Sequence, residues 1–304
     1  MLFRWMRRRT DMPEKILISE THDILTSGGG GVLRQRIPFG GAWLELGADF
    51  ISRSFAEFPE TLCFVHKHPY ISRFILVESG QVTVWLEGRR YEISANEAYL
   101  LPAGICFETE YRRGSVCKGF HLHLFDGRNL PVVSGLDSPC ILRDGKFAAL
   151  LSQAIAKSTI PSAETLVFYA LIQMLEKQFP MLLERLVCDP FYEAMLKEVK
   201  AGATASLRLE SFAQRFHRSP AALSKGFYRT FGISWKLYQQ TVLLRQAREL
   251  LSRPSLSVAA VADQLGFRSE KYFFAFYRKM TGQTPMFARK QLRTAHLPNK
   301  EQSE

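Results

Sequence analysis

Two stretches in the last third of the chain, LESFAQRFHRSPAALSKGFYRTFG (209–232) and VAAVADQLGFRSEKYFFAFYRKMTG (258–282), repeat one pattern. After one extra residue in the second turn the copies align, so that Leu223 corresponds to Phe273. Each copy ends in glycine, the residue that most readily stops a helix in the left-handed conformation. Each stretch therefore predicts a short helix, a tight turn and a second helix, and together they predict two helix-turn-helix units.

The segment between the two units, SWKLYQQTVLLRQARELLSRP (234–254), predicts one long helix. Its apolar side chains share one face, and Pro254 ends it. A helix of about 18 residues is ~27 Å long at 1.5 Å per residue. Successive major grooves on one face of B-DNA lie ~34 Å apart. A stiff connector of this length would therefore hold two recognition helices near the spacing of neighbouring grooves.

These motifs resemble the DNA-binding domain of the AraC family of bacterial transcription regulators. The resemblance rests on SPAALSKGFYRTFG (219–232), a connector ending in ARELL (247–251), SVAAVADQLGF (257–267) and YFFAFYRKMTGQTPMFAR (272–289). The family implies a seven-helix domain with a helix-turn-helix at each end of the connector. It also implies an N-terminal effector or dimerisation domain, often cupin-like. The expected fold class is therefore α+β multidomain, with an N-terminal cupin-like β-barrel, a helical linker and a C-terminal all-α domain with two helix-turn-helix motifs.

The resemblance implies which side chains face bases, position by position. In the first recognition helix they are Ala221, Ser224 and Lys225, and in the second they are Lys271, Phe274 and Ala275. Lys225 is the best candidate for guanine, because an ammonium donates to O6 and N7. Phe274 and Ala275 have no donor for a base and offer only apolar contact to a thymine methyl. The second unit is therefore predicted to be the weaker reader.

Four polar residues stand at the turns and helix starts: Arg218, Ser219, Arg268 and Ser269. There they could bind phosphates through their side chains and through free helix N–H groups. The alternative is that the two serines simply cap the following helices, a role compatible with phosphate contact. The buried positions of the repeat are predicted to form core and to make no direct contact with DNA.

The charge of the chain is concentrated in the part with the repeat. Residues 189–304 hold 19 Lys+Arg and 9 Asp+Glu, a net charge of +10, whereas residues 1–188 hold 21 and 20, a net charge of +1. A basic surface of this size attracts a polyanion and releases its counterions on docking. A solvated basic face is the alternative, but charge together with two helix-turn-helix patterns favours nucleic acid.

The first half of the chain has the pattern of a β domain. Short runs rich in Val, Ile, Leu, Phe and Tyr, separated by turn residues, fill 61–125 and predict a sandwich or small barrel. Residues before 61 are poorly periodic. The expected organisation is a cupin-like effector or regulatory domain at 1–140, a helical linker at 141–188, an AraC-type DNA-binding domain at 189–295 and a disordered tail at 296–304.

The linker contains an apolar stripe broader than one neighbour requires. Leu166, Tyr169, Ala170, Ile172, Gln173 and Leu175 form it. Two explanations stay open, namely packing on the β domain and a homodimer interface.

Several residues of the β region are candidates for a small-molecule effector pocket. They are His66, His68, Tyr70, Arg73, Trp85, Phe107 and His121. Metal-dependent cupins carry a histidine pair, a glutamate a few residues on, and a histidine after a P-x-G turn. Here Arg73 stands near the glutamate position and Phe107 at the last histidine position, so two of four ligands are missing. A four-histidine site that adds His121 and His123 is the alternative. No cofactor or metal and no enzymatic activity are expected.

The sequence thus predicts a regulator, most simply an effector-responsive activator, that binds double-stranded promoter DNA. RNA polymerase as a partner is implied by the family resemblance alone. The five scattered cysteines and the lack of an apolar signal segment favour a cytoplasmic protein, and no run is long enough to span a membrane. The alternatives are a metal-dependent cupin enzyme fused to a DNA-binding domain, and a regulator whose N-terminal domain only dimerises.

Overall fold

A computed structural model gives the arrangement of the chain. It describes residues 15–18, 26–28, 32–39, 42–67, 70–133, 138–158, 160–178, 190–202, 204–205 and 207–294. His68 and the predicted tail at 296–304 lie outside the described residues.

The N-terminal half forms two facing sheets, as the alternating runs predict. One sheet has the order β1-β5-β10-β7-β8, and the other β12-β9-β6-β11-β4-β2, with β3 paired to β4. The first consists of β1 (Lys15–Ile18), β5 (Leu62–Lys67), β10 (Cys106–Tyr111), β7 (Gln81–Leu86) and β8 (Arg89–Ser94). The second consists of β12 (Cys140–Leu142), β9 (Glu97–Leu101), β6 (Ser72–Ser79), β11 (Val116–Asp126), β4 (Ala42–Glu57), β2 (Thr26–Gly28) and β3 (Val32–Phe39). The predicted cupin-like β-barrel is confirmed as a sheet-rich half-barrel.

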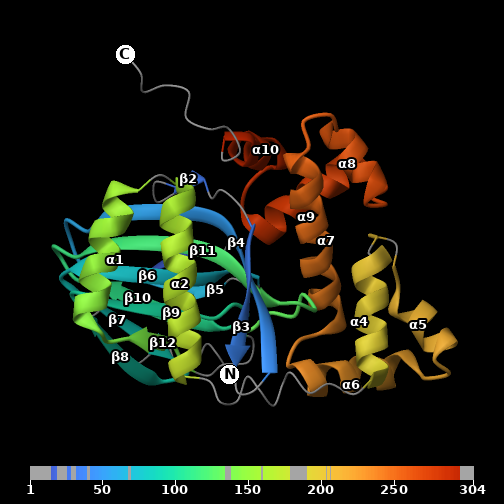
Figure 1. Cartoon of the computed structure of the whole chain (residues 1–304), viewed down its shortest axis with the longest axis horizontal. Helices are drawn as coiled ribbons and strands as arrows, with labels where there is room; N and C mark the ends of the chain where they lie inside the picture. The colour runs from blue at the N-terminus through green and yellow to red at the C-terminus, as the bar shows by residue number, and fades with distance from the viewer. Residues whose placement is uncertain are drawn as a thin grey trace.

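Strand β6 shows how the half-barrel is built, because it is buried on both faces. Ile75 and Val77 point into the half-barrel and join an apolar core with residues of β7 and β10. Phe74 and Leu76 point the other way, into a second core that includes helices α1 (Gly145–Lys157) and α2 (Ile160–Gln178). Figure 1 shows these two helices side by side over that sheet.

The broad stripe of α2 packs mainly on this sheet. Ala170, Ile172 and Leu175 belong to the shared core, while Tyr169 and Gln173 stay exposed. Packing on the β domain thus accounts for the breadth of the stripe, and the exposed pair is what remains for any partner.

The C-terminal part has the helices that the family resemblance implies. They are α4 (Pro190–Gly202), α5 (Leu209–Arg215), α6 (Pro220–Phe231), α7 (Trp235–Ser252), α8 (Val258–Gln264), α9 (Glu270–Thr281) and α10 (Pro285–Thr294). The two matched glycines do end the recognition helices. Gly232 and Gly282 are left-handed, with φ of 70° and 78°, and their N–H groups donate to Tyr228 and Arg278 carbonyls at 2.8 and 2.7 Å.

The connector α7 is one helix of 18 residues that belongs to both units. Its first half, with Tyr238 and Val242, completes the core of α4, α5 and α6. Its second half, with Leu244 and Ala247, completes the core of α8, α9 and α10. The two helix-turn-helix units are therefore joined by shared hydrophobic packing along a single rigid element. Among the described residues, none of the helices is long and apolar enough to cross a membrane.

Candidate DNA-binding surface and inter-domain cavity

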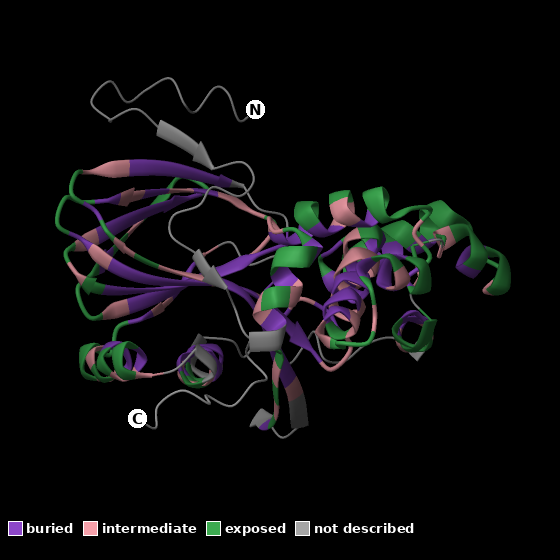
Figure 2. Ribbon diagram, turned by 90° about the horizontal axis from the view of Figure 1, so that it is seen from above, coloured by how far each residue is buried: buried purple, intermediate pink, exposed green. Residues whose placement is uncertain are grey.

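Recognition helix α6 presents its N-terminal half to solvent. Its first turn is capped by Ser219, whose Oγ accepts a hydrogen bond from the Ala222 N–H at 3.2 Å. Ala221, Ser224 and Lys225 are exposed, while the opposite face is buried in the core. The three positions that the resemblance assigns to base contact are thus all open to solvent. Figure 2 shows that the helices of the C-terminal part carry both exposed and buried stretches.

Recognition helix α9 is more deeply engaged with the protein. Lys271 and Ala275 are exposed, but Phe274 is half-buried and packs against the core of the second unit. Arg268 and Ser269 are exposed, and Ser269 makes no side-chain capping bond. Apart from Lys271, the predicted base-facing positions of α9 therefore have little with which to form hydrogen bonds.

The two turns hold their arginines differently. Arg218 lies with its guanidinium carbon 4.4 Å from the ring centre of Phe191, a cation–π contact that orients an exposed charge at the start of α6. No such ring contact is found for Arg268 within the described part of the chain.

Two exposed tyrosines escaped the sequence prediction. Tyr228 on α6 and Tyr272 on α9 each expose 60% of their surface. Tyr272 follows Lys271 in the first turn of α9, where a hydroxyl reaches bases or phosphates. Its place next to Lys271, on the open face of the helix, was the available signal.

The half-barrel and the helical part are joined by a buried ion pair. Arg248 on α7 and Asp49 on β4 are 3% and 2% exposed, and Nε lies 2.7 Å from Oδ1. Arg248 also donates to the Phe50 carbonyl at 2.9 Å and to the Tyr277 hydroxyl of α9 at 3.3 Å. Burial raises the pKa of Asp49, and Arg248 opposes that rise by favouring the carboxylate. The contact thus ties β4 to both the connector and the second recognition helix.

Further hydrogen bonds extend this junction. The hydroxyl of Tyr238 donates to the Arg128 carbonyl at 2.9 Å, and Lys200 Nζ donates to the Gly127 carbonyl at the same distance. Near the second unit, Gln283 donates to the Ile51 carbonyl at 3.3 Å. Both helix-turn-helix units are therefore attached to the half-barrel.

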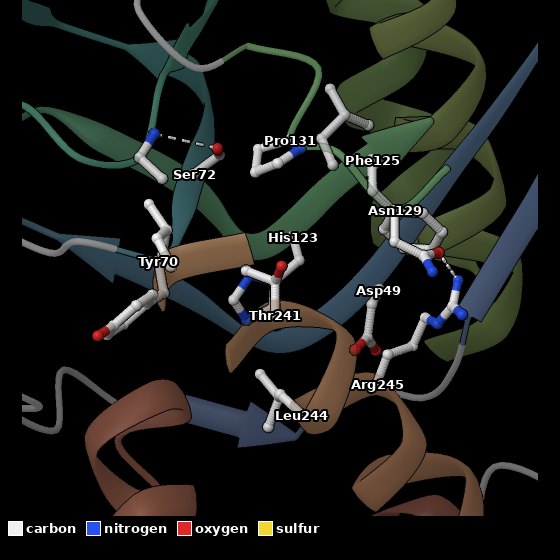
Figure 3. A pocket seen from close by; sticks show the side chains of 13 residues that line it. Asp49, Tyr70, Ser72, His123, Phe125, Asn129, Pro131, Thr241, Leu244 and Arg245 are labelled. Carbon is white, nitrogen blue, oxygen red and sulfur yellow. Dashed lines mark hydrogen bonds between the residues drawn. The ribbon is translucent and has the colours of Figure 1, made fainter. Parts of the chain in front are cut away.

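A cavity lies where α7 covers the open end of the half-barrel (Figure 3). It is lined by Asp49, Tyr70, Ser72, Ala103, His123, Leu124, Phe125, Asn129, Pro131, Leu237, Thr241, Leu244 and Arg245. Its volume is about 30 Å³, roughly enough for two water molecules. An organic molecule would need α7 or its side chains to move.

Deeper in the half-barrel, four of the predicted pocket residues come together. The His66 ring stacks on Phe107 with centres 4.8 Å apart, and the Arg73 guanidinium carbon lies 5.5 Å from the centre of the same ring. Arg73 also pairs in register with His121, whose Nδ1 lies 3.0 Å from Ser52 Oγ. These four residues, His66, Arg73, Phe107 and His121, are called the polar band below.

The other predicted pocket residues lie elsewhere. Trp85 is on the opposite face of β7 from Val84 and Leu86, because successive strand residues alternate, so it does not join the polar band. Tyr70 lines the cavity at α7, and its hydroxyl donates to Gln240 at 2.9 Å. Within the described residues, no three His, Cys, Asp or Glu side chains are grouped to hold a metal ion. His68, which the four-histidine alternative needs, lies outside them.

Comparison with known proteins agrees with this arrangement. A model of a helix-turn-helix domain matches residues 212–291, and a model of a cupin domain matches residues 59–114. The Msm operon regulatory protein of Streptococcus mutans is 25% identical over 239 residues, covering 73% of this chain and 84% of that protein. The regulatory protein PocR of Salmonella typhimurium is 32% identical over 112 residues, covering 36% of this chain but 37% of its own length.

Among solved structures, ToxT from Vibrio cholerae matches 81% of this chain and 98% of its own, with 14% identity and a TM-score of 0.46. The fold, the two helix-turn-helix units and the relatives define a DNA-binding transcription regulator with a cupin-type N-terminal domain. More particularly, residues 212–291 match an AraC-type helix-turn-helix domain, and the relatives that this chain resembles are AraC-family regulators.

Proposed function

We propose that one copy of this protein grips two successive major grooves of promoter DNA, with α6 in one groove and α9 in the next. The observation that carries this proposal is the pair of recognition helices at the two ends of one 18-residue helix. That helix spans ~27 Å, close to one turn of B-DNA once the width of the flanking units is added.

The two helices contribute unequally in this proposal. Ser224 and Lys225 of α6 donate hydrogen bonds to base edges, and Ala221 lies beside them. On α9, Lys271 supplies the polar contact, while Phe274 and Ala275 offer apolar surface. Arg218, Ser219, Arg268 and Ser269 bind phosphates at the two turns.

An effector acts, in this proposal, on the junction between the half-barrel and α7. The cavity is walled by both domains, and Asp49 belongs both to the cavity and to the ion pair with Arg248. A ligand that enters from the half-barrel side therefore competes with the docking of α7, and shifts the population of docked and undocked arrangements. Arg248 transmits that shift to α9 through Tyr277.

The remaining partners are also proposals. The exposed pair Tyr169 and Gln173 on α2 is the surface that a second copy would use in a homodimer. RNA polymerase is the partner that an activator of this family requires, and the cytoplasm is where it meets DNA. The relatives reported above are named as regulatory proteins, which supports a role without catalysis.

The experiment is selection of bound DNA from a random pool with the full chain, followed by sequencing and gel-shift titration. Two preferred segments one helical turn apart are expected within one protein footprint. Lys225→Ala should cost ~1–3 kcal/mol at the selected site and relax preference at one base pair. The matched control is Lys146→Ala, an exposed lysine on α1 with the same loss of charge. An unchanged titration for Lys225→Ala would remove its base-contact role, and a uniform loss on all sequences would reassign it to phosphate.

A further inference from the structure

Arg73 is a buried cation inside the half-barrel. It is 7% exposed and lies on β6, on the same face as Ile75 and Val77, which point into the apolar interior. Its backbone pairs with Leu101 on β9 and His121 on β11, so it is held near the middle of the seven-stranded sheet. The side chain is thus fixed by the sheet and enclosed by the half-barrel.

No carboxylate of the described residues pairs with this guanidinium. Its side-chain neighbour is the ring of Phe107, at 5.5 Å, and the acidic groups that act on it are the phenols of Tyr99 and Tyr111. Burial lowers the pKa of Arg73 to about 10, so the side chain remains charged at neutral pH. A buried charge without a counterion costs several kcal/mol, which a folded protein tolerates mainly where function requires it.

His66 adds a second unsatisfied group beside Arg73. It is 6% exposed, its Nε2 lies 2.8 Å from Thr109 Oγ1, and its Nδ1 has no hydrogen-bond partner. Burial, with smaller effects of Arg73 and His121, holds the pKa of His66 well below its usual range, so the ring is neutral. A neutral imidazole has one free position for a ligand hydrogen bond.

The order of side chains along β11 places these groups between the cavity and the apolar interior. His123 lines the cavity at α7, His121 comes next on the same face, and Cys117 lies in the apolar core. On β11 the polar band therefore lies between the cavity at α7 and the apolar core of the half-barrel.

We propose that the polar band binds the acid group of a small organic monocarboxylate, with Arg73 as its counterion and His66 as a second hydrogen-bond partner. This rests on the proposed effector role of the N-terminal domain and names the chemical class of the effector. A guanidinium matches a carboxylate with two parallel hydrogen bonds.

The surroundings favour one negative charge and an apolar body. Arg73 is the one arginine or lysine of the band, and a dianion such as a phosphate ester would bring more negative charge than this single guanidinium balances. The groups around it, Phe107, Tyr99, Tyr111 and Ile75, are aromatic or aliphatic. An acid with an aromatic or aliphatic body matches these groups chemically, and they would have to part to admit it because they pack as core.

The test is thermal unfolding of the full chain at constant ionic strength with three acid–amide pairs: benzoate and benzamide, phenylacetate and phenylacetamide, hexanoate and hexanamide. At least one acid should raise the Tm by several degrees more than its amide, because it binds the folded state alone. Inorganic phosphate serves as the anion without a body and should have no comparable effect. If no acid separates from its amide, or if phosphate stabilises equally, the proposal is overturned.

The variant Arg73→Met separates loss of acid binding from loss of folding, because it is expected to fold at least as stably as the wild type. Removal of an uncompensated buried charge should raise the Tm of the ligand-free protein by a few degrees and abolish the acid-specific shift. The control Arg143→Met removes an exposed arginine that is paired with Glu97 at 2.8 Å, and should keep the acid-specific shift. A lower Tm for ligand-free Arg73→Met, or an acid shift that survives in it, would show that Arg73 is structural.

A gel-shift titration with and without the stabilising acid separates this inference from the proposed function. If the acid binds through Arg73 but leaves DNA affinity unchanged, the carboxylate site is supported and effector control of DNA binding fails. If Lys225→Ala leaves DNA binding unchanged while the thermal shifts are as expected, the assigned base contact fails and the carboxylate site is again supported.

Discussion

The two helix-turn-helix units have nearly the same sequence pattern but different attachments. The first unit packs on a leading helix, α4, and meets the half-barrel through backbone carbonyls at Gly127 and Arg128. The second is led by the connector α7 itself, and a buried arginine of α7 links its recognition helix to the half-barrel. The first unit is therefore attached to the half-barrel through α4 and α7, whereas the second is attached through its recognition helix α9 as well.

This difference matches what each recognition helix offers to DNA. Recognition helix α6 exposes Ser224 and Lys225, and the hydrogen bonds described above between its unit and the half-barrel are donated by α4 and α7. Recognition helix α9, which carries Phe274 and Ala275, is the one whose Tyr277 hydroxyl accepts a hydrogen bond from Arg248. In this proposal, base recognition and regulation are thus divided between two copies of one motif.

The largest expected effect comes from breaking the buried ion pair. Arg248→Ala leaves Asp49 buried without its partner and should lower the free energy of unfolding by about 3–5 kcal/mol, measured by urea denaturation. The control Arg253→Ala removes an exposed pair with Glu249 and should change stability little. The double variant Asp49→Leu with Arg248→Met should recover most of the loss, since it buries no charge. No recovery would mean that the loss does not come from the charge left on Asp49.

A second expected effect concerns the leading helix of unit one. A Cβ at Gly226 of α6 would collide with the Tyr192 hydroxyl of α4, so Gly226→Ala should cost about 1–3 kcal/mol of stability by overpacking. The aligned position in α9 is Phe276, a half-buried side chain that packs against the core of the second unit. Phe276→Ala therefore creates no collision, and any loss there comes from apolar contact instead. Wild-type stability of Gly226→Ala would show that α4 yields easily.

A third comparison uses the serines at the two turns. Ser219 caps α6 and Ser269 makes no side-chain cap, so Ser219→Ala should cost about 1 kcal/mol and Ser269→Ala under about half of that. Thermal unfolding of both variants without DNA provides the measurement. Equal losses would indicate that the two serines have the same capping role.

The smallest expected effect transplants a donor onto α9. Ala275 aligns with Lys225, so Ala275→Lys should add a base preference in the half of the site that unit two contacts. The gain in affinity should stay below about 1 kcal/mol, because α9 has no polar neighbour that would orient the new ammonium. Repeating the DNA selection with this variant would show the new preference, and an unchanged selected sequence would mean that α9 does not reach the bases.

The paired helices could be predicted from sequence because their signals are local. The apolar positions recur within a few residues, and a glycine ends each recognition helix. Both glycines, Gly232 and Gly282, adopt the expected left-handed conformation. The pairing of Asp49 with Arg248 could not be predicted, since 199 residues separate them and neither lies in a motif. Poor periodicity before residue 61 also concealed β3.

The candidate pocket was partly predictable for a related reason. Residue type pointed to His66, Arg73, Phe107 and His121, which the sheets bring together. Type alone also selected Trp85, although strand alternation places it opposite Val84. Which side chain faces inward depends on register, and register is set by pairing with distant strands.

Helix α7 has one further consequence for how operators of this regulator would be built. The same helix fixes the distance between α6 and α9 and covers the open end of the half-barrel. No signal from the half-barrel can stretch that distance without unfolding the helix. If one subunit contacts two DNA segments as proposed, we therefore expect their spacing to stay constant, and a change of operator geometry to arise between subunits or by release of a whole domain.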